Sequence, residues 1–79
     1  MKIYYDPKAD ALDIIFKEGK VSETREVGRE IYLDVDKKGE PLSLEILVAS
    51  ERLPVEEFNQ LSISFTNYPK NLRKPVVAR

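Results

Sequence analysis

The sequence contains no cysteine and no histidine. Without cysteine there is no disulfide framework and no thiolate nucleophile, which disfavours a secreted, disulfide-held scaffold and favours an intracellular location. Without histidine the chain lacks the commonest general base and metal ligand, so Ser-His and Cys-His catalytic sites are excluded. Catalysis would rest on carboxylates, lysine, tyrosine or serine alone, and we expect a protein that is not an enzyme.

Long apolar runs are also missing. No run approaches the ~20 residues that cross a bilayer, and Met1 leads directly into a strand pattern rather than into a signal peptide. A length of 79 residues with 42% hydrophobic content is typical of one small globular domain. We therefore expect a soluble, cytoplasmic protein.

Charge is unevenly distributed along a chain whose formal net charge is −1. Residues 1–65 hold all 14 acidic residues and 9 of the 13 basic ones, a net charge of −5, whereas residues 66–79 hold four basic residues and no acid. The sequence therefore combines an acidic body with a basic tail.

Two alternating apolar runs flank a turn in Glu30–Leu47, and this stretch organises the rest of the chain. Alternation of apolar and polar residues indicates half-buried strands, and Asp36–Gly39 predicts a type I turn closed by a left-handed glycine. The sequence therefore predicts a central β-hairpin with one apolar face, formed by Ile31, Leu33, Val35, Leu42, Leu44 and Ile46.

The remaining segments complete the predicted fold. Residues 2–5, 11–16 and 61–65 have strand patterns, Gly28-Arg29 predicts a type II′ turn, and Pro54–Gln60 is the one predicted helix. Val21–Val27 is polar on both faces, which suits an edge strand, yet a simple meander would place it centrally. Either the sheet bends there or the strands do not pair in sequence order.

The predicted fold class is α+β. We expect an antiparallel sheet of five or six strands, mostly hairpins, with one short helix, in a single domain over residues 1–66. Residues 67–79 are predicted to be a basic tail that stays extended or disordered until something binds it.

One stretch imitates a calcium-binding loop, with acids at its first, third and twelfth positions and glycine at its sixth, namely Asp34, Asp36, Glu45 and Gly39. The imitation fails because Lys38 stands where an oxygen ligand belongs and Pro41 replaces an aliphatic residue. No helical pattern flanks the stretch. We interpret it as a hairpin turn with outward-facing acids.

Three further acids, Asp6, Asp10 and Asp13, are candidates for a magnesium site. Simpler roles account for them, because Asp6 can bond its own turn, Asp10 can cap the entry to the next strand and Asp13 alternates toward solvent. The sequence predicts no metal site, no cofactor and no catalytic residues.

The second face of the predicted sheet carries more apolar side chains than a solvated face needs. If the more apolar set faces the core, this second face holds Tyr4, Ile15, Tyr32 and Leu47. Either the helix covers these residues, or they form an interface with a second copy in a homodimer or with a small protein partner. We predict the interface, because Tyr combines a large apolar body with a polar tip.

The basic tail offers an alternative function. Lys70, Arg73 and Lys74 lie near Tyr68 and are candidates for contacts with nucleic acid, by phosphate binding and base stacking. Four charges are few, and a solvated tail is the simpler interpretation. Nucleic-acid binding through the tail is therefore kept as the alternative to protein binding.

Three motifs, YDPKADAL, LDVD-x-x-G and LEIL-x-AS, carry a resemblance over about residues 1–53. Together they resemble the small prokaryotic domain-of-unknown-function family numbered 2283. The resemblance implies a stand-alone domain without assigned catalytic residues, and an antitoxin-like or accessory binding role, since some members are encoded beside small toxins. The chain departs from the family pattern at Pro41 and Ser43 and in its extension Leu61–Arg79.

Overall fold

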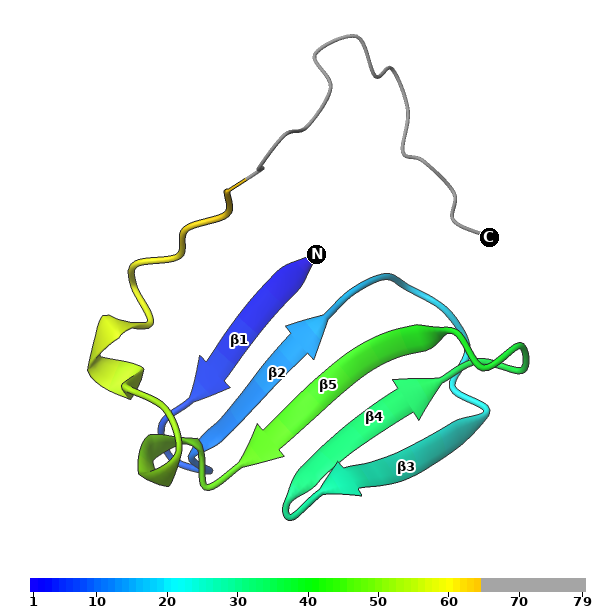
Figure 1. The fold of residues 1–79 in the computed structure, drawn as a ribbon, viewed down its shortest axis with the longest axis horizontal. Coiled ribbons are helices and arrows are strands. Elements are labelled where there is room, and N and C mark those ends of the chain that lie inside the picture. Colours follow the sequence, from blue (N-terminus) through cyan, green and yellow to red (C-terminus); the bar gives the residue numbers. More distant parts are fainter. Residues whose placement is uncertain (65–79) are drawn as a thin grey trace, which may run out of the picture.

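The computed structural model of the chain describes residues 1–64. Five strands and two 3₁₀ turns make up this part of the chain (Figure 1). The predicted tail, residues 67–79, lies outside the described residues. The elements, in chain order, are β1 (Lys2–Asp6), β2 (Ala11–Ile15), β3 (Glu23–Gly28), β4 (Ile31–Val35), β5 (Pro41–Leu47), η1 (Ala49–Glu51) and η2 (Val55–Glu57).

All five strands form one antiparallel sheet in the order β1-β2-β5-β4-β3. The predicted hairpin is confirmed as β4 and β5, and β5 occupies the centre of the sheet. Its turn has the predicted form, because Gly39 adopts a φ of 82° and donates its N–H to the Asp36 carbonyl oxygen at 2.9 Å. The alternating pattern thus predicted the position of the central pair, but not the register shift between Asp34 and Val35.

The polar strand β3 lies at an edge of the sheet, where it pairs with β4. The strands therefore do not pair in sequence order, which settles the alternative that the sequence left open. The β2–β3 connection crosses one end of the sheet (Figure 1) and is held there by bonds from the Phe16 N–H to the Leu42 carbonyl oxygen and from the Ser22 N–H to the Val35 carbonyl oxygen, both 2.8 Å. Gly19 in this connection lies so close to Leu42 that a Cβ would stand 2.8 Å from Leu42 Cδ2.

The predicted helix over Pro54–Gln60 is wrong. In residues 1–64 the structure contains no α-helix, and this segment forms only the 3₁₀ turn η2. Pro54 has a non-helical ψ of 81°, and seven residues are too few to nucleate an isolated α-helix without a packed apolar stripe. The fold is therefore a small antiparallel sheet with 3₁₀ turns, not an α+β domain with a helix covering the sheet.

Two smaller predictions are also corrected. Leu61–Ser64, the described part of the predicted strand over residues 61–65, pairs with no strand. The β3–β4 turn is not type II′, because Gly28 ends β3 and the positive φ (59°) falls on Glu30. A register shift between Glu26 and Gly28 moves this turn by one residue relative to the expected position.

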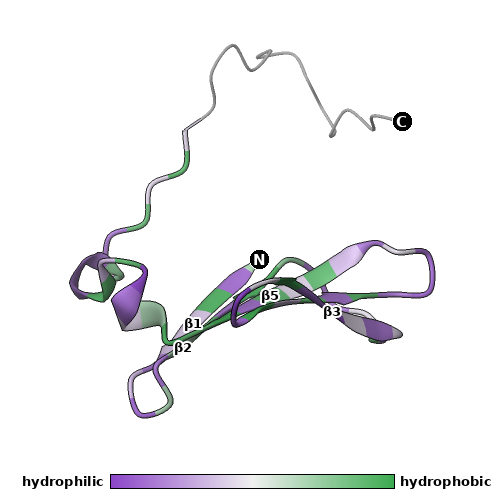
Figure 2. Ribbon diagram, turned by 60° about the horizontal axis from the view of Figure 1, so that its bottom comes forward, coloured by the Kyte–Doolittle hydropathy of each residue, from purple (hydrophilic) through white to green (hydrophobic). Residues whose placement is uncertain are grey.

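The buried side chains lie at the two ends of the sheet. Ala11, Leu12 and Ala49 are buried at the η1 end, and Val35 and Leu42 are buried where the β2–β3 connection crosses. Seen toward its edge, the sheet is a single layer of strands with the 3₁₀ turns at one end (Figure 2). The described residues include no helix long and apolar enough to cross a membrane.

Candidate functional site

Three hydrogen bonds converge on the carboxylate of Asp10, in the loop between β1 and β2. The Tyr5 hydroxyl donates to Asp10 Oδ1 (2.7 Å), and Ser50 donates from its N–H to Oδ1 (2.9 Å) and from its hydroxyl to Oδ2 (2.7 Å). The Ala49 N–H also donates to the Asp10 carbonyl oxygen (3.0 Å). Asp10 has a φ of 53°, a left-handed conformation that Asp adopts more readily than most residues. The β1–β2 loop is thereby joined to η1.

These bonds decide what the cluster does chemically. The hydrogen bond from the Ser50 side chain has the largest effect on Asp10, followed by the bond from Tyr5, and both lower the pKa of Asp10 because they stabilise its charged form. The bond between Tyr5 and Asp10 also raises the pKa of Tyr5. A carboxylate with a lowered pKa is a weak base, and the chain has no histidine that would take a proton from Ser50. The cluster therefore fixes the β1–β2 loop to η1.

A row of five directly opposed residues crosses the whole sheet on one face, which we call the acidic face. The pairings Tyr4–Asp13, Asp13–Glu45, Glu45–Tyr32 and Tyr32–Glu26 place one residue of the row on each strand. Asp13 and Glu45 are direct cross-strand neighbours, an arrangement that is unfavourable for two like charges. The row therefore places two tyrosines around a pair of acids whose repulsion nothing in the row relieves.

A second row on the acidic face adds another carboxylate beside the first. Asp34 accepts hydrogen bonds from the hydroxyls of Ser43 (3.1 Å) and Thr24, its cross-strand neighbours. A shallow hollow of about 460 Å³ lies between the two rows, lined by Asp13, Thr24, Tyr32, Asp34, Ser43 and Glu45. This hollow is open and polar, and it offers hydrogen-bond acceptors to a positively charged group.

The other side of the sheet, which we call the apolar face, carries two rows of directly opposed side chains. Each row has four apolar or aromatic members, and the first continues onto Arg25 of β3, opposite Leu33. Of the eight apolar members only Leu12 is buried, and Ile3 is 42% exposed. The rows are Ile3, Ile14, Leu44 and Leu33, followed by Tyr5, Leu12, Ile46 and Ile31.

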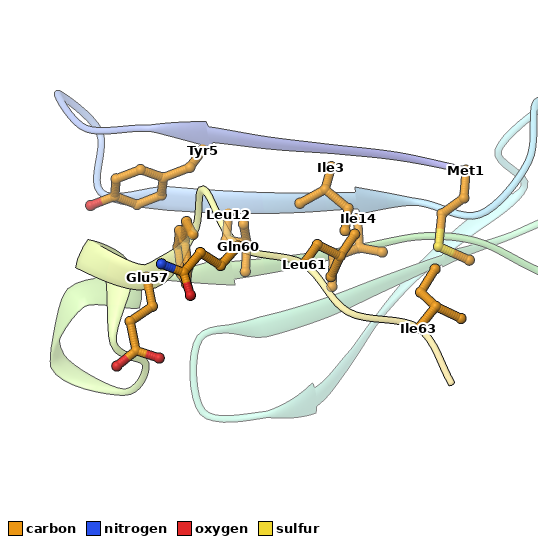
Figure 3. Close-up of a pocket in the computed structure, with 10 residues that line it drawn as sticks. Met1, Ile3, Tyr5, Leu12, Ile14, Glu57, Gln60, Leu61 and Ile63 are labelled. Carbon is orange, nitrogen blue, oxygen red and sulfur yellow. The ribbon is translucent and has the colours of Figure 1, made fainter. Parts of the chain in front are cut away.

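The chain segment after η2 and the β1–β2 half of the apolar face line the two sides of a cleft. The rings of Tyr5 and Phe58 meet edge to face with centroids 5.1 Å apart. Further along, Leu61 lies beside Ile14 and Ile63 lies near Met1 (Figure 3), and a cleft of about 530 Å³ separates the segment from the strands. No residue of β4 or β5 lines this cleft.

A family model for a protein of unknown function, DUF2283, matches residues 2–50. The chain belongs to this family. The resemblance expected for about residues 1–53 is thereby confirmed, and the matched region contains all five strands and ends at Ser50 of the Asp10 cluster. Neither the curated proteins nor the solved structures gave a match to the chain.

The predicted interface residues of this DUF2283 domain share one face. Tyr4 and Tyr32 belong to the acidic row, Ile15 pairs with Ser43 in the second row, and Leu47 pairs with Ala11 at the η1 end. Tyr4 is 53% exposed and the other three are half-buried. Whether they bind a partner stays a prediction. The predicted nucleic-acid contacts, Lys70, Arg73 and Lys74, lie outside the described residues.

Two of the three acids weighed as magnesium ligands, Asp6 and Asp10, accept hydrogen bonds from backbone N–H groups. Asp6 Oδ1 accepts the Lys8 N–H (2.9 Å), Asp10 is held by Ser50, and Asp13 lies in the acidic row. Asp36 Oδ1 accepts the N–H groups of Lys38 and Glu40, both at 2.9 Å. Across residues 1–64, His, Cys, Asp and Glu side chains form no group of three that would hold a metal ion.

Sequence reasoning missed two contacts of this site. The bond between Asp10 and Ser50 joins residues 40 positions apart, and its only signal was that both residues occur in motifs of the family. The opposition of Asp13 and Glu45 depends on β2 pairing with β5, so it had no signal in the sequence.

Proposed function

We propose that this DUF2283 domain is a protein-interaction module that binds a basic protein partner through its acidic face. The observation that carries the proposal is the acidic row, in which Asp13 and Glu45 are directly opposed between Tyr4 and Tyr32. Two like charges in this position cost stability, and a cation supplied by a partner would remove that cost.

The composition of the face agrees with protein binding. Tyrosine is enriched at protein interfaces, and Ile15 and Leu47 add apolar area next to the acids. Binding rather than catalysis is supported by the absence of histidine and cysteine and by the engagement of Ser50 with Asp10. An antitoxin-like role fits this chemistry, because the face would cover the basic surface of a small RNA-directed toxin.

Glu45→Lys tests the proposal, because it separates stability from binding. Replacing one of two opposed acids with a lysine turns a repulsion into an attraction, so the isolated protein should gain up to about 1 kcal/mol in urea unfolding. Affinity capture from the source cell should meanwhile lose a basic partner that wild type retains in low salt and releases in high salt.

Glu51→Lys is the matched control, since it changes the net charge equally at an exposed position in η1, outside the sheet. It should capture the same basic partner as wild type. Retention of that partner by Glu45→Lys would contradict the proposal.

A further inference from the structure

No second layer covers the apolar face within residues 1–64. The segment from Phe58 to Ile63 borders β1 and β2 across a cleft and leaves Ile3 of β1 42% exposed. The side chains of Leu33, Leu44, Ile31 and Ile46 on β4 and β5 are partly exposed although their strands lie inside the sheet. Domains normally bury the apolar face of a sheet against a second layer. The described part of the chain forms one layer, so the second layer has to come from elsewhere.

We propose that a second copy of this chain supplies the second layer, by packing its own apolar face on this one in a two-fold symmetric β-sandwich. A two-fold axis would place the apolar face of each copy on that of the other and leave each copy's Phe58–Ile63 segment at the rim. The exposed side chains of Leu61 (68%) and Ile63 (67%) would then border the buried centre.

Charge favours a second copy on this face. A two-fold interface places identical surfaces against each other, so a surface with net charge repels itself. On the apolar face the charged residues of β3 cancel, since Arg25 Nε lies 3.1 Å from Glu23 Oε2. The acidic face, in contrast, carries five strand carboxylates against one strand lysine, Lys2, and would repel its own copy; the carboxylates are those of Asp6, Asp13, Glu26, Asp34 and Glu45.

The size of the face fits a dimer of modest affinity. Five strands spaced about 4.8 Å apart and about 17 Å long cover roughly 400 Å² in projection, so two copies would hide roughly 800 Å². The accessible area of corrugated side chains is larger than their projection, which brings the contact near the ~1,000 Å² of a specific interface. Area alone does not set affinity, and for a contact at the small end of specific interfaces we expect a dissociation constant on the order of micromolar.

The sequence after Ser64 is a weaker candidate for the occupant. It contains no alternating apolar run that would pair as strands of a second layer, and it carries four cations with no acid. An unrelated protein partner would need an apolar face that matches this one, whereas a second copy of the chain carries such a face. The proposal does not rest on the proposed function, because it concerns the opposite face.

The test compares two substitutions at neighbouring positions of β4 that point to opposite faces. Leu33→Glu places an acid opposite Arg25, so the monomer accommodates it, but it buries a charge in the proposed interface. Tyr32→Lys places a base opposite Glu45 and Glu26 on the acidic face. Sedimentation of the full chain from about 1 to about 200 µM spans the expected dissociation constant.

Wild type and Tyr32→Lys should dimerise with similar dissociation constants, and Leu33→Glu should raise the constant by at least about tenfold. Mixed isotope labelling of wild type keeps the test independent of whether variants fold, since methyl groups of Leu33 and Leu44 should show contacts between differently labelled copies. A monomeric wild type, a dimer lost in Tyr32→Lys but kept in Leu33→Glu, or contacts of these methyls only with residues after Ser64 of the same chain would overturn the proposal.

Discussion

Asp10 joins segments that lie far apart in the sequence. Its carboxylate accepts bonds from Tyr5 in β1 and Ser50 in η1, and its carbonyl oxygen accepts the Ala49 N–H. Ala49 is completely buried beneath this contact. The Asp10 side chain therefore fixes the end of the sheet at which β5 ends and η1 begins. From this end the chain turns toward the apolar face.

The pH dependence of stability should report on this carboxylate. The folded-state pKa of Asp10 lies below its unfolded value of about 3.9. Its stabilising contribution is therefore fully present above the unfolded pKa and is lost as the pH falls through the folded pKa. Ser50→Ala removes the largest cause of the shift, so a carbon-detected titration of the carboxyl groups should show the pKa of Asp10 rising toward its usual value.

Asp36 is the internal control in the same titration. Backbone N–H groups, chiefly that of Glu40, lower the pKa of Asp36, and Ser50→Ala does not touch them. The pKa of Asp36 should stay unchanged. An unchanged pKa of Asp10 in Ser50→Ala would show that the Ser50 bond does not act in solution.

Local patterns predicted the elements whose causes are local. Alternation in Glu30–Leu47 predicted β4 and β5, and Asp36–Gly39 predicted the turn between them, because neighbouring residues determine both. The polar character of β3 indicated an edge strand, but the pairing of β2 with β5 depends on contacts between distant segments and could not be derived. The acidic row depends on that pairing. The sequence therefore predicted that the two tyrosines of the row share a face, but not that acids lie between them.

The segment after β5 was misread for a related reason. Pro54, two acids and an apolar stripe suggested a helix, but the stripe has too few members and the backbone is satisfied by 3₁₀ bonds such as that from the Phe58 N–H to the Val55 carbonyl oxygen (3.1 Å). Likewise, alternation at Leu61 and Ile63 suggested a strand, but within residues 1–64 these residues join no sheet and their side chains are 68% and 67% exposed.

The β4–β5 turn should depend on the backbone freedom of Gly39. A Cβ at this position would meet nothing within 4 Å, so the cost of a substitution comes from the φ of 82° alone. Gly39→Ala should destabilise the protein by about 1 kcal/mol, whereas Gly39→Asn should cost clearly less because Asn tolerates the left-handed region. Urea unfolding of both variants at one protein concentration measures the difference, and equal losses would argue against a conformational cause.

The two faces give the whole molecule different chemistry on its two sides. One face carries carboxylates and tyrosines in cross-strand rows, and the other carries eight apolar or aromatic side chains in two rows. If the apolar faces pair, both acidic faces of the dimer point outward. Each dimer would then present two identical sites to a basic partner, and avidity would strengthen binding to a partner that is itself dimeric.

Deleting Asn71–Arg79 should leave both folding and association intact. The strand pairs of the described sheet and the bonds that fix its two ends are formed by residues 1–64, and the deleted stretch has no alternating or helical apolar pattern. The free energy of unfolding should change by less than about 1 kcal/mol, the scale of one lost packing contact. Because dimerisation ties stability to concentration, both proteins must be compared at the same subunit concentration. A larger loss, with the shortened chain dimerising more tightly, would mean that the deleted residues cover the apolar face and compete with the second copy.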